Sequence, residues 1–178
     1  EIIDLSIRGR AVSSGKSSDI STAEVWRGAV YGLKEWKVTL RQSSFGVVLG
    51  AIPGVGSSVV DWLSYAYGMI FVKDRSMIGK GWLDGVLFAE AAQNSKEGGQ
   101  AIPTLALGIP GGTGWVIIMV AMMAYGVSPG PQMLDPDGTA HITVVLVITL
   151  ALGNLMITVL GLLAARQMVR LTTIPYPA

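Results

Sequence analysis

Two glycine- and proline-rich segments interrupt apolar stretches of the chain, and small hydroxyl side chains come directly after each of them. Residues 50–56 (GAIPGVG) precede Ser57 and Ser58, and residues 108–112 (GIPGG) precede Thr113. Proline lacks a backbone donor and glycine permits non-helical dihedral angles, so each segment predicts that one helix ends and another begins. The residues expected to break the helices are Gly50, Pro53, Gly56, Gly108 and Pro110.

A helix that restarts after such a break is suited to hold an anion. Its first amide N–H groups lack intrahelical partners and carry partial positive charge, which favours a carboxylate or phosphate. The candidate substrate-binding residues at the breaks are Gly54, Ser57, Ser58, Gly111 and Thr113. The hydroxyl residues could instead serve only as helix caps, and the residue pattern leaves both roles open.

The two breaks also resemble each other in the residues downstream of them. Ile52-Pro53-Gly54 is followed by Tyr67-Gly68, and Ile109-Pro110-Gly111 by Tyr125-Gly126, at nearly the same interval. Matched Gly/Pro interruptions in corresponding apolar segments indicate a transporter binding site. The alternative is that two common Pro-Gly turns coincide.

Polar residues that could take part in transport lie between the breaks. Glu90, Asn94 and Glu97 have the spacing of one helix face. Asn94, beside Gly98 and Gly99, could bind a substrate carboxylate or a sodium ion, and Glu90 could carry a proton. Lys96 and Glu97 are more simply read as a solvated loop.

Asp61 is the only charged residue between Gln42 and Val72. An ionisable residue inside an apolar segment marks a transport pathway by default. Asp61 is therefore a further ion-coupling candidate, with a position near the membrane interface as the equal alternative.

Composition supports a membrane protein. Of the 178 residues, 51% are hydrophobic and only 14% are charged, against about 25% charge in a typical soluble domain. Such a composition excludes a disordered chain, and the absence of cysteine excludes a disulfide scaffold or thiolate metal site. The net charge of +1 gives no field that favours nucleic acid. The first residue is Glu1, and we expect an internal fragment of a longer protein.

The distribution of charge divides the chain into two expected regions. Residues 1–41 form a polar loop followed by one amphipathic helix, whose tryptophans and basic residues suit a membrane interface; a surface helix of a soluble domain is the alternative. Residues 42–178 form the transmembrane region. Within it, residues 142–165 contain no charge and predict a complete span, with its basic C-terminal end in the cytoplasm.

The sequence lacks the residues that a phosphate-binding loop, a zinc site or a catalytic triad would need. The glycine-rich segments do not match a phosphate-binding loop. The single histidine, His141, lies in an expected polar turn. One histidine does not indicate a zinc site or a catalytic triad. No catalytic residue, metal site or bound cofactor is predicted.

Several motifs resemble the large membrane subunit of tripartite tricarboxylate transporters, the TctA family. They are GVVLGAIPGVG, AEAAQNSKEGGQAIPTLALGIPGG, AYGVSPGPQML and the closing IPYP. The resemblance covers about residues 30–177, which correspond to the second half of that subunit. Its motifs map onto Gly46, Gly50, Pro53, Gly54, Gly56, Glu90, Asn94, Gly98, Gly99, Pro103, Leu107, Gly108, Pro110 and Gly111.

The resemblance implies a secondary transporter of the bacterial inner membrane. Together with the two breaks, it predicts an all-α, multi-pass permease with discontinuous or re-entrant helices. It further implies uptake of tricarboxylates or related acids, coupled to Na⁺ or H⁺. The implied partners are a small membrane subunit and a periplasmic substrate-binding protein. The chain departs from the family pattern at Ala89, Gln93, Tyr125 and residues 112–114, so citrate itself is not assumed to be the substrate.

Two other classes remain as alternatives on the residues alone. One is a membrane-embedded enzyme that uses Asp61 or Glu90 as an acid or base, which would need a second reacting group. The other is a soluble glycine-rich ligand-binding domain.

Overall fold

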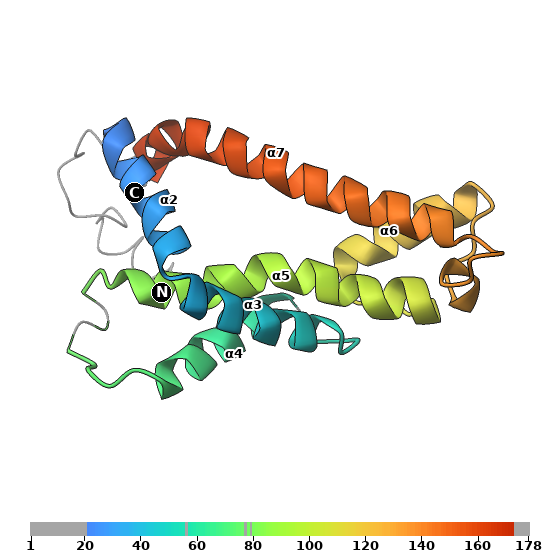
Figure 1. Cartoon of the computed structure of the whole chain (residues 1–178), viewed down its shortest axis with the longest axis horizontal. Helices are drawn as coiled ribbons and strands as arrows, with labels where there is room; N and C mark the ends of the chain where they lie inside the picture. Colours follow the sequence, from blue (N-terminus) through green and yellow to red (C-terminus); the bar gives the residue numbers. More distant parts are fainter. Residues whose placement is uncertain (1–20, 56, 77, 79, 173–178) are drawn as a thin grey trace, which may run out of the picture. The chain divides into compact units, whose positions relative to one another are not determined.

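The chain is all-α throughout the residues that the computed structural model describes, namely 21–55, 57–76, 78 and 80–172. The elements are α2 (Thr22–Lys34), α3 (Trp36–Gly50), α4 (Ser57–Ile70), α5 (Leu83–Leu107), α6 (Thr113–Ala124), the short 3-10 helix η1 (Pro131–Met133) and α7 (Ala140–Thr172) (Figure 1). This confirms the expected fold class at the level of an all-helical chain. The polar loop predicted before residue 19 lies outside the described residues.

The chain divides into two compact units. One consists of Gly32–Ile148, and the other of Glu1–Tyr31 together with Thr149–Ala178. The first unit contains both predicted breaks and is built from α3, α4, α5 and α6.

Helices α3 and α4 form an antiparallel hairpin whose tip is the first glycine–proline segment. Midway along the hairpin, the hydroxyl of Ser64 lies 2.9 Å from Oε1 of Gln42, and both side chains are buried. The rings of Phe45 and Tyr67 stack with their centroids 4.3 Å apart. These contacts hold the two arms together, so the chain reverses direction between Gly50 and Ser57.

Helix α5 runs parallel to α3, and small residues let the two backbones come close together (Figure 1). A Cβ atom on Gly46 would lie 2.7 Å from the Cα of Ala92, and one on Gly50 would overlap the backbone of Lys96. Gly46 and Gly50 are one helical turn apart, the spacing of small residues at packed helix pairs in membranes. Gly50 is thus the last residue of α3 and also part of its contact with α5.

Gly98 and Gly99 are neighbours in α5, but only Gly99 lies against α3. The two positions therefore provide a matched test of the contact between α3 and α5. We expect Gly99→Ala to lower the free energy of unfolding by about 1–3 kcal/mol, because the added methyl would overlap the backbone of Val47. A methyl added at Gly98 would meet nothing within 4 Å, so Gly98→Ala should be neutral or slightly stabilising. Thermal unfolding in detergent compares the two variants, and equal melting temperatures would contradict close α3–α5 packing.

The second glycine–proline segment ends α5 by backbone geometry. Gly108 adopts a left-handed conformation with φ of 69°, which glycine tolerates without a steric penalty. Its N–H donates to the carbonyl of Thr104 and the next N–H, of Ile109, donates to that of Pro103. The chain then folds back along α5 before α6 begins at Thr113.

The segment predicted to be amphipathic and helical before residue 41 forms two helices, α2 and α3, with Glu35 between them. The hydroxyl of Thr39 donates to the carbonyl of Gly32 at 3.2 Å, satisfying one of the carbonyls that the end of α2 leaves without a helical partner. Helix α3 continues through residue 41, so the change in charge there does not mark the end of a helix. The division into two regions at this position stays a prediction.

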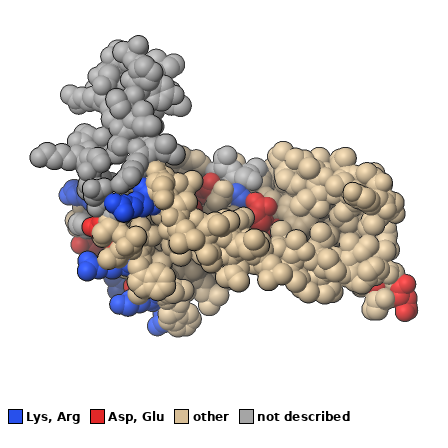
Figure 2. Space-filling model, turned by 90° about the horizontal axis from the view of Figure 1, so that it is seen from above, with Lys and Arg blue, Asp and Glu red and all other residues tan. Residues whose placement is uncertain are grey.

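Among the described residues, one helix is long and apolar enough to cross a membrane, the stretch Ala140–Val169 of α7. This stretch contains the predicted span 142–165. His141 was expected in a turn but lies in the first turn of α7. A broad part of the visible surface carries no charged side chain (Figure 2), and the region 98–134 contributes none at all.

Candidate functional site

The two predicted breaks meet consecutive turns of α5. Gly50, where the first break begins, lies against the backbone of Lys96. Gly111 in the second break lies against Gln100, so closely that a Cβ added to Gly111 would be 2.6 Å from the Cα of Gln100. Lys96 and Gln100 are one turn apart, about 6 Å along the helix axis. Two segments far apart in sequence are therefore brought to neighbouring positions on one helix.

Thr104 anchors the second break to α5. Its buried hydroxyl donates to the carbonyl of Gln100 at 2.6 Å and accepts the N–H of Gly111 at 3.0 Å. Because Gly111 has no side chain, its backbone can approach α5 closely enough for this bond. The second break is thus held by a specific hydrogen bond as well as by close packing.

Buried polar side chains line the face of α5 at the breaks, and the sequence interpretation missed them. Lys96 and Gln100 are each only 1% exposed, and Thr104 is fully buried. The prediction of a solvated loop at Lys96 and Glu97 is wrong, since both residues lie inside α5. A four-residue spacing could have revealed the buried face, whose members are Phe88, Ala92, Lys96, Gln100 and Thr104.

A second buried polar group lies midway along the α3–α4 hairpin, away from its tip. Ser64 contacts Oε1 of Gln42 and lies 2.5 Å from the carbonyl of Phe88, which links all three helices. Nε2 of Gln42 is buried without a partner among the described residues. This group was also missed, because Gln42 and Ser64 stand in unrelated sequence contexts.

The residues predicted at the first break are only partly described. Pro53 and Gly54 are exposed at the tip of the hairpin. Gly56 and the side chains of Ser57 and Ser58 lie outside the described part, so their roles stay predictions. The helical restart at Ser57 is observed.

The residues predicted at the second break differ in their exposure. Gly111 is buried against Gln100, whereas Thr113 is exposed at the first position of α6. Gly112, which precedes α6, gives that helix no side-chain cap. The first N–H groups of α6 therefore receive no side-chain hydrogen bond from the residue before the helix.

The polar residues predicted between the breaks occupy a different face of α5. Glu90, Asn94 and Gly98 are exposed, while Gly99 is buried in the contact with α3. Asp61 on α4 is half-buried, and its Oδ1 is buried with no hydrogen-bond partner among the described residues. The structure thus does not bring Asn94 onto the face that meets the breaks.

Three hollows formed by described residues contain none of the predicted site residues. A cavity of about 510 Å³ lies where the end of α4, the following loop and the start of α5 meet. The guanidinium of Arg41 lies 3.9 Å from the ring centre of Phe71 there. At its edge, hydrogen bonds from Ser76 hold the pKa of Asp74 below its ordinary value.

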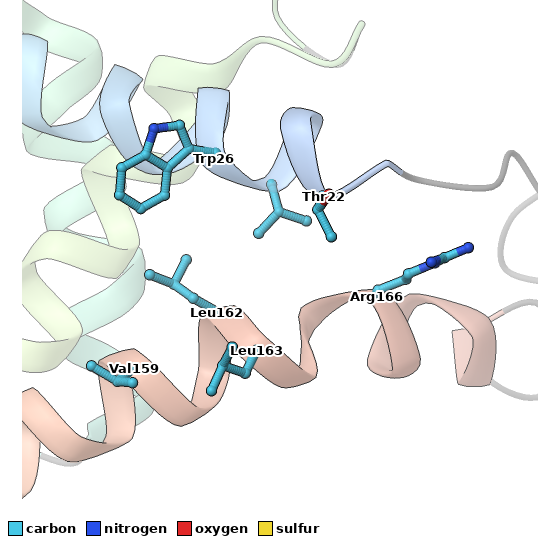
Figure 3. Close-up of a pocket in the computed structure, with 7 residues that line it drawn as sticks. Thr22, Trp26, Val159, Leu162, Leu163 and Arg166 are labelled. Carbon is cyan, nitrogen blue, oxygen red and sulfur yellow. The ribbon is translucent and has the colours of Figure 1, made fainter.

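Another hollow, of about 360 Å³, lies between α2 and the C-terminal part of α7 (Figure 3). Trp26 from one helix and Leu162 and Leu163 from the other give it an apolar lining, with Arg166 at one side. Among the described residues, no group of His, Asp or Glu side chains has the arrangement of a metal site.

Among the described residues, one helix of membrane-crossing length and composition agrees with an α-helical integral membrane protein. The family model of the tripartite tricarboxylate transporter TctA family matches residues 1–178, and the chain belongs to this family. Members of the family are the membrane component of these transporters and are not enzymes. The alternatives of an embedded enzyme and a soluble domain are thereby set aside.

Two relatives come from Agrobacterium vitis. An uncharacterised 52.8 kDa protein in the TAR-I ttuC' 3' region is 29% identical over 137 residues, which are 77% of this chain and 27% of the relative. An uncharacterised protein in the TAR-II ttuC' 3' region is 30% identical over 131 residues, 74% of this chain and 53% of the relative. The chain thus spans between about a quarter and about half of these relatives. No solved structure matches it significantly.

Proposed function

We propose that this chain is part of the membrane permease subunit of a tripartite tricarboxylate-type secondary transporter. The subunit moves tricarboxylates or related organic acids into the cell, driven by a gradient of Na⁺ or H⁺. It is a multi-pass protein of the bacterial inner membrane. Its partners are a small membrane subunit and a periplasmic substrate-binding protein. Membership of the TctA family supports each of these statements.

The observation that carries the proposal is the meeting of both breaks on consecutive turns of α5. Broken helices in lipid are tolerated where protein or a water-filled cavity covers them, and transporters place their substrate sites at such breaks. We therefore assign the substrate site to the ends of α3 and α5 and the starts of α4 and α6. In the membrane these segments form discontinuous or re-entrant helices.

Helix starts supply the chemistry for a carboxylate substrate. The N-terminus of α6 carries uncapped N–H groups and partial positive charge, with Thr113 exposed beside them. Gly54, Ser57 and Ser58 provide the corresponding start at α4, and Gly99 and Gly111 let backbones approach. Gly98, which is exposed on α5, is assigned to the same site. Alternating access moves this site between the two membrane faces.

The coupling ion is assigned to Asp61, Glu90 and Asn94. The unpartnered, buried Oδ1 of Asp61 supports this assignment, since a cation or proton would satisfy it. Glu90 and Asn94 are exposed on one face of α5, where they can meet another segment of the full-length permease or an ion pathway.

Uptake of labelled carboxylates by cells that express the full-length permease with both partner proteins tests the proposal. A panel of mono-, di- and tricarboxylates, with sodium and proton gradients varied separately, identifies the substrate and the driving ion. We expect gradient-dependent accumulation of at least one di- or tricarboxylate in unmodified form. Absence of accumulation under every gradient, with all three proteins present in the membrane, would contradict the function.

Asn94→Ala tests the part assigned to the exposed face of α5. We expect the KM for substrate or for the coupling ion to rise about tenfold, equivalent to about 1.4 kcal/mol of lost binding. Initial uptake rates, normalised to the amount of permease in the membrane, measure the effect. Unchanged rates at every substrate and ion concentration would remove Asn94 from the site.

A further inference from the structure

Lys96 is a buried cation without a buried anion to balance it. Its side chain is 1% exposed in the middle of α5, and its ammonium Nζ contacts Oε1 of Gln93, an uncharged amide. Within the described part of the chain, no carboxylate forms an ion pair with it. Its backbone lies against Gly50, at the point where the first break begins.

An unbalanced charge at this depth is costly. Moving an ammonium group out of water costs several kcal/mol even after the protein relaxes, and one amide oxygen recovers only part of that cost. Lysine in a membrane-embedded segment is rare for this reason and marks a functional position. An anion near Lys96 would offset this cost.

Gln100 adds a second unsatisfied donor one turn further along the same helix. It is 1% exposed, and its Nε2 has no hydrogen-bond partner among the described residues. Its amide group lies against Gly112, so that a Cβ added to Gly112 would be 2.5 Å from Oε1 of Gln100. Gly112 immediately precedes α6, whose uncapped N-terminus carries partial positive charge.

Three kinds of donor belong to residues that lie where the breaks meet α5, although the ammonium of Lys96 is directed toward Gln93, on the preceding turn. They are the ammonium of Lys96, the amide N–H₂ of Gln100 and the first backbone N–H groups of α6. Lys96 and Gln100 stand at i and i+4, so their side chains share one face of the helix. An anionic group with several oxygens, such as a carboxylate, can accept from all three kinds.

We propose that Lys96 and Gln100, with the N-terminus of α6, bind one carboxylate group of the transported substrate. This inference rests on the proposed function and deepens it by assigning a fixed positive charge to the substrate site. Lys96 forms the ion pair, and Gln100 orients the carboxylate toward α6. A coupling cation is then excluded from this position by repulsion and must bind elsewhere.

Lys96→Met tests the proposal in the full-length permease with its two partner proteins. Uptake is measured with whichever di- or tricarboxylate the wild type accumulates. We expect the KM to rise at least tenfold, while Lys96→Arg, which keeps the charge, retains part of the affinity. The matched control is Lys80→Met, at an exposed lysine outside the helices, and it should leave the KM unchanged.

Gln100→Leu is the second test variant. Leucine is similar in size to glutamine, and the substitution removes the amide without changing the charge. We expect a smaller rise in KM, by about three- to tenfold, because Gln100 contributes a hydrogen bond but no charge. Thermal unfolding of purified permease with and without the same carboxylate shows whether each variant is folded and whether it still binds. Folded Lys96→Met protein should lose the substrate-induced rise in melting temperature.

The outcomes distinguish a failure of the proposed transport function from a failure of the assignment of Lys96 and Gln100. A wild type that accumulates no carboxylate overturns the proposed function itself. A wild type that transports, with Lys96→Met and Gln100→Leu both unchanged in KM and in substrate-induced stabilisation, overturns this inference alone. If Lys96→Met cannot be obtained folded, Gln100→Leu decides. Loss of stability at Lys96→Met with an unchanged KM would show that another segment of the permease supplies the anion, and it counts against the inference.

Discussion

Replacing Gly111 with leucine should abolish carboxylate uptake by the full-length permease. A side chain at this position would overlap Gln100, since even a Cβ atom there would lie 2.6 Å from its Cα and carbonyl oxygen. The second break would be forced away from α5, and the hydrogen bond from Gly111 N–H to Thr104 would be lost. Displacement of binding groups by about 1 Å can cost about 100-fold in rate, so we expect a loss of at least that size.

The matched control for this variant is Gly153→Leu in α7, where an added Cβ would meet nothing within 4 Å. Both variants make the same chemical change in an apolar helical protein. Initial uptake rates are normalised to permease in the membrane, and substrate-induced thermal stabilisation reports binding. Equal uptake by the Gly111→Leu and Gly153→Leu proteins would show that close contact between the second break and α5 is unnecessary.

Thr104→Val should have the second largest effect. Valine keeps the shape of threonine but removes the hydroxyl that joins Gly111 N–H to the Gln100 carbonyl. The buried N–H of Gly111 would then lack a partner, at a cost of about 1–3 kcal/mol. We expect lower thermal stability and about a tenfold rise in KM, because the start of α6 would no longer be held in place.

Thr158→Val serves as the control for this variant. Thr158 makes the same type of hydrogen bond, from its hydroxyl to the carbonyl four residues earlier, but it is exposed on α7. Its replacement should leave uptake and KM near those of the wild type. If the two valine variants behaved alike, Thr104 would contribute only local helix stability.

The helix breaks were accessible from sequence because their causes are local. Proline and glycine act on the backbone wherever they stand, so the ends of α3 and α5 could be placed at the two glycine–proline segments. The uncharged run after residue 141 likewise predicts a long apolar helix from composition alone. The sequence did not predict the division between α2 and α3 at Glu35, because the apolar residues on both sides keep the same helical spacing.

The burial of Lys96 and Gln100 could not be read from their neighbours in sequence. It depends on Gly46 and Gly50 allowing α3 to lie directly on α5, and on Gly111 allowing the second break to return to the same helix. The nearby Asn94 is a more typical polar site residue, yet it is exposed on another face. The spacing of small residues in α3 and in the second break indicates which face of α5 is buried, whereas the polarity of a single residue does not.

Carboxylate binding at the start of α6 is tested most directly by cysteine labelling at Thr113. The chain has no cysteine, so Thr113→Cys introduces a single reactive thiol here, in a full-length permease whose other segments are made cysteine-free. Thr158→Cys provides the comparison on α7. With transport retained, saturating carboxylate should slow maleimide labelling at position 113 at least tenfold and leave position 158 unaffected. Equal labelling rates at position 113 with and without a carboxylate that the same protein transports would contradict a substrate site at this break.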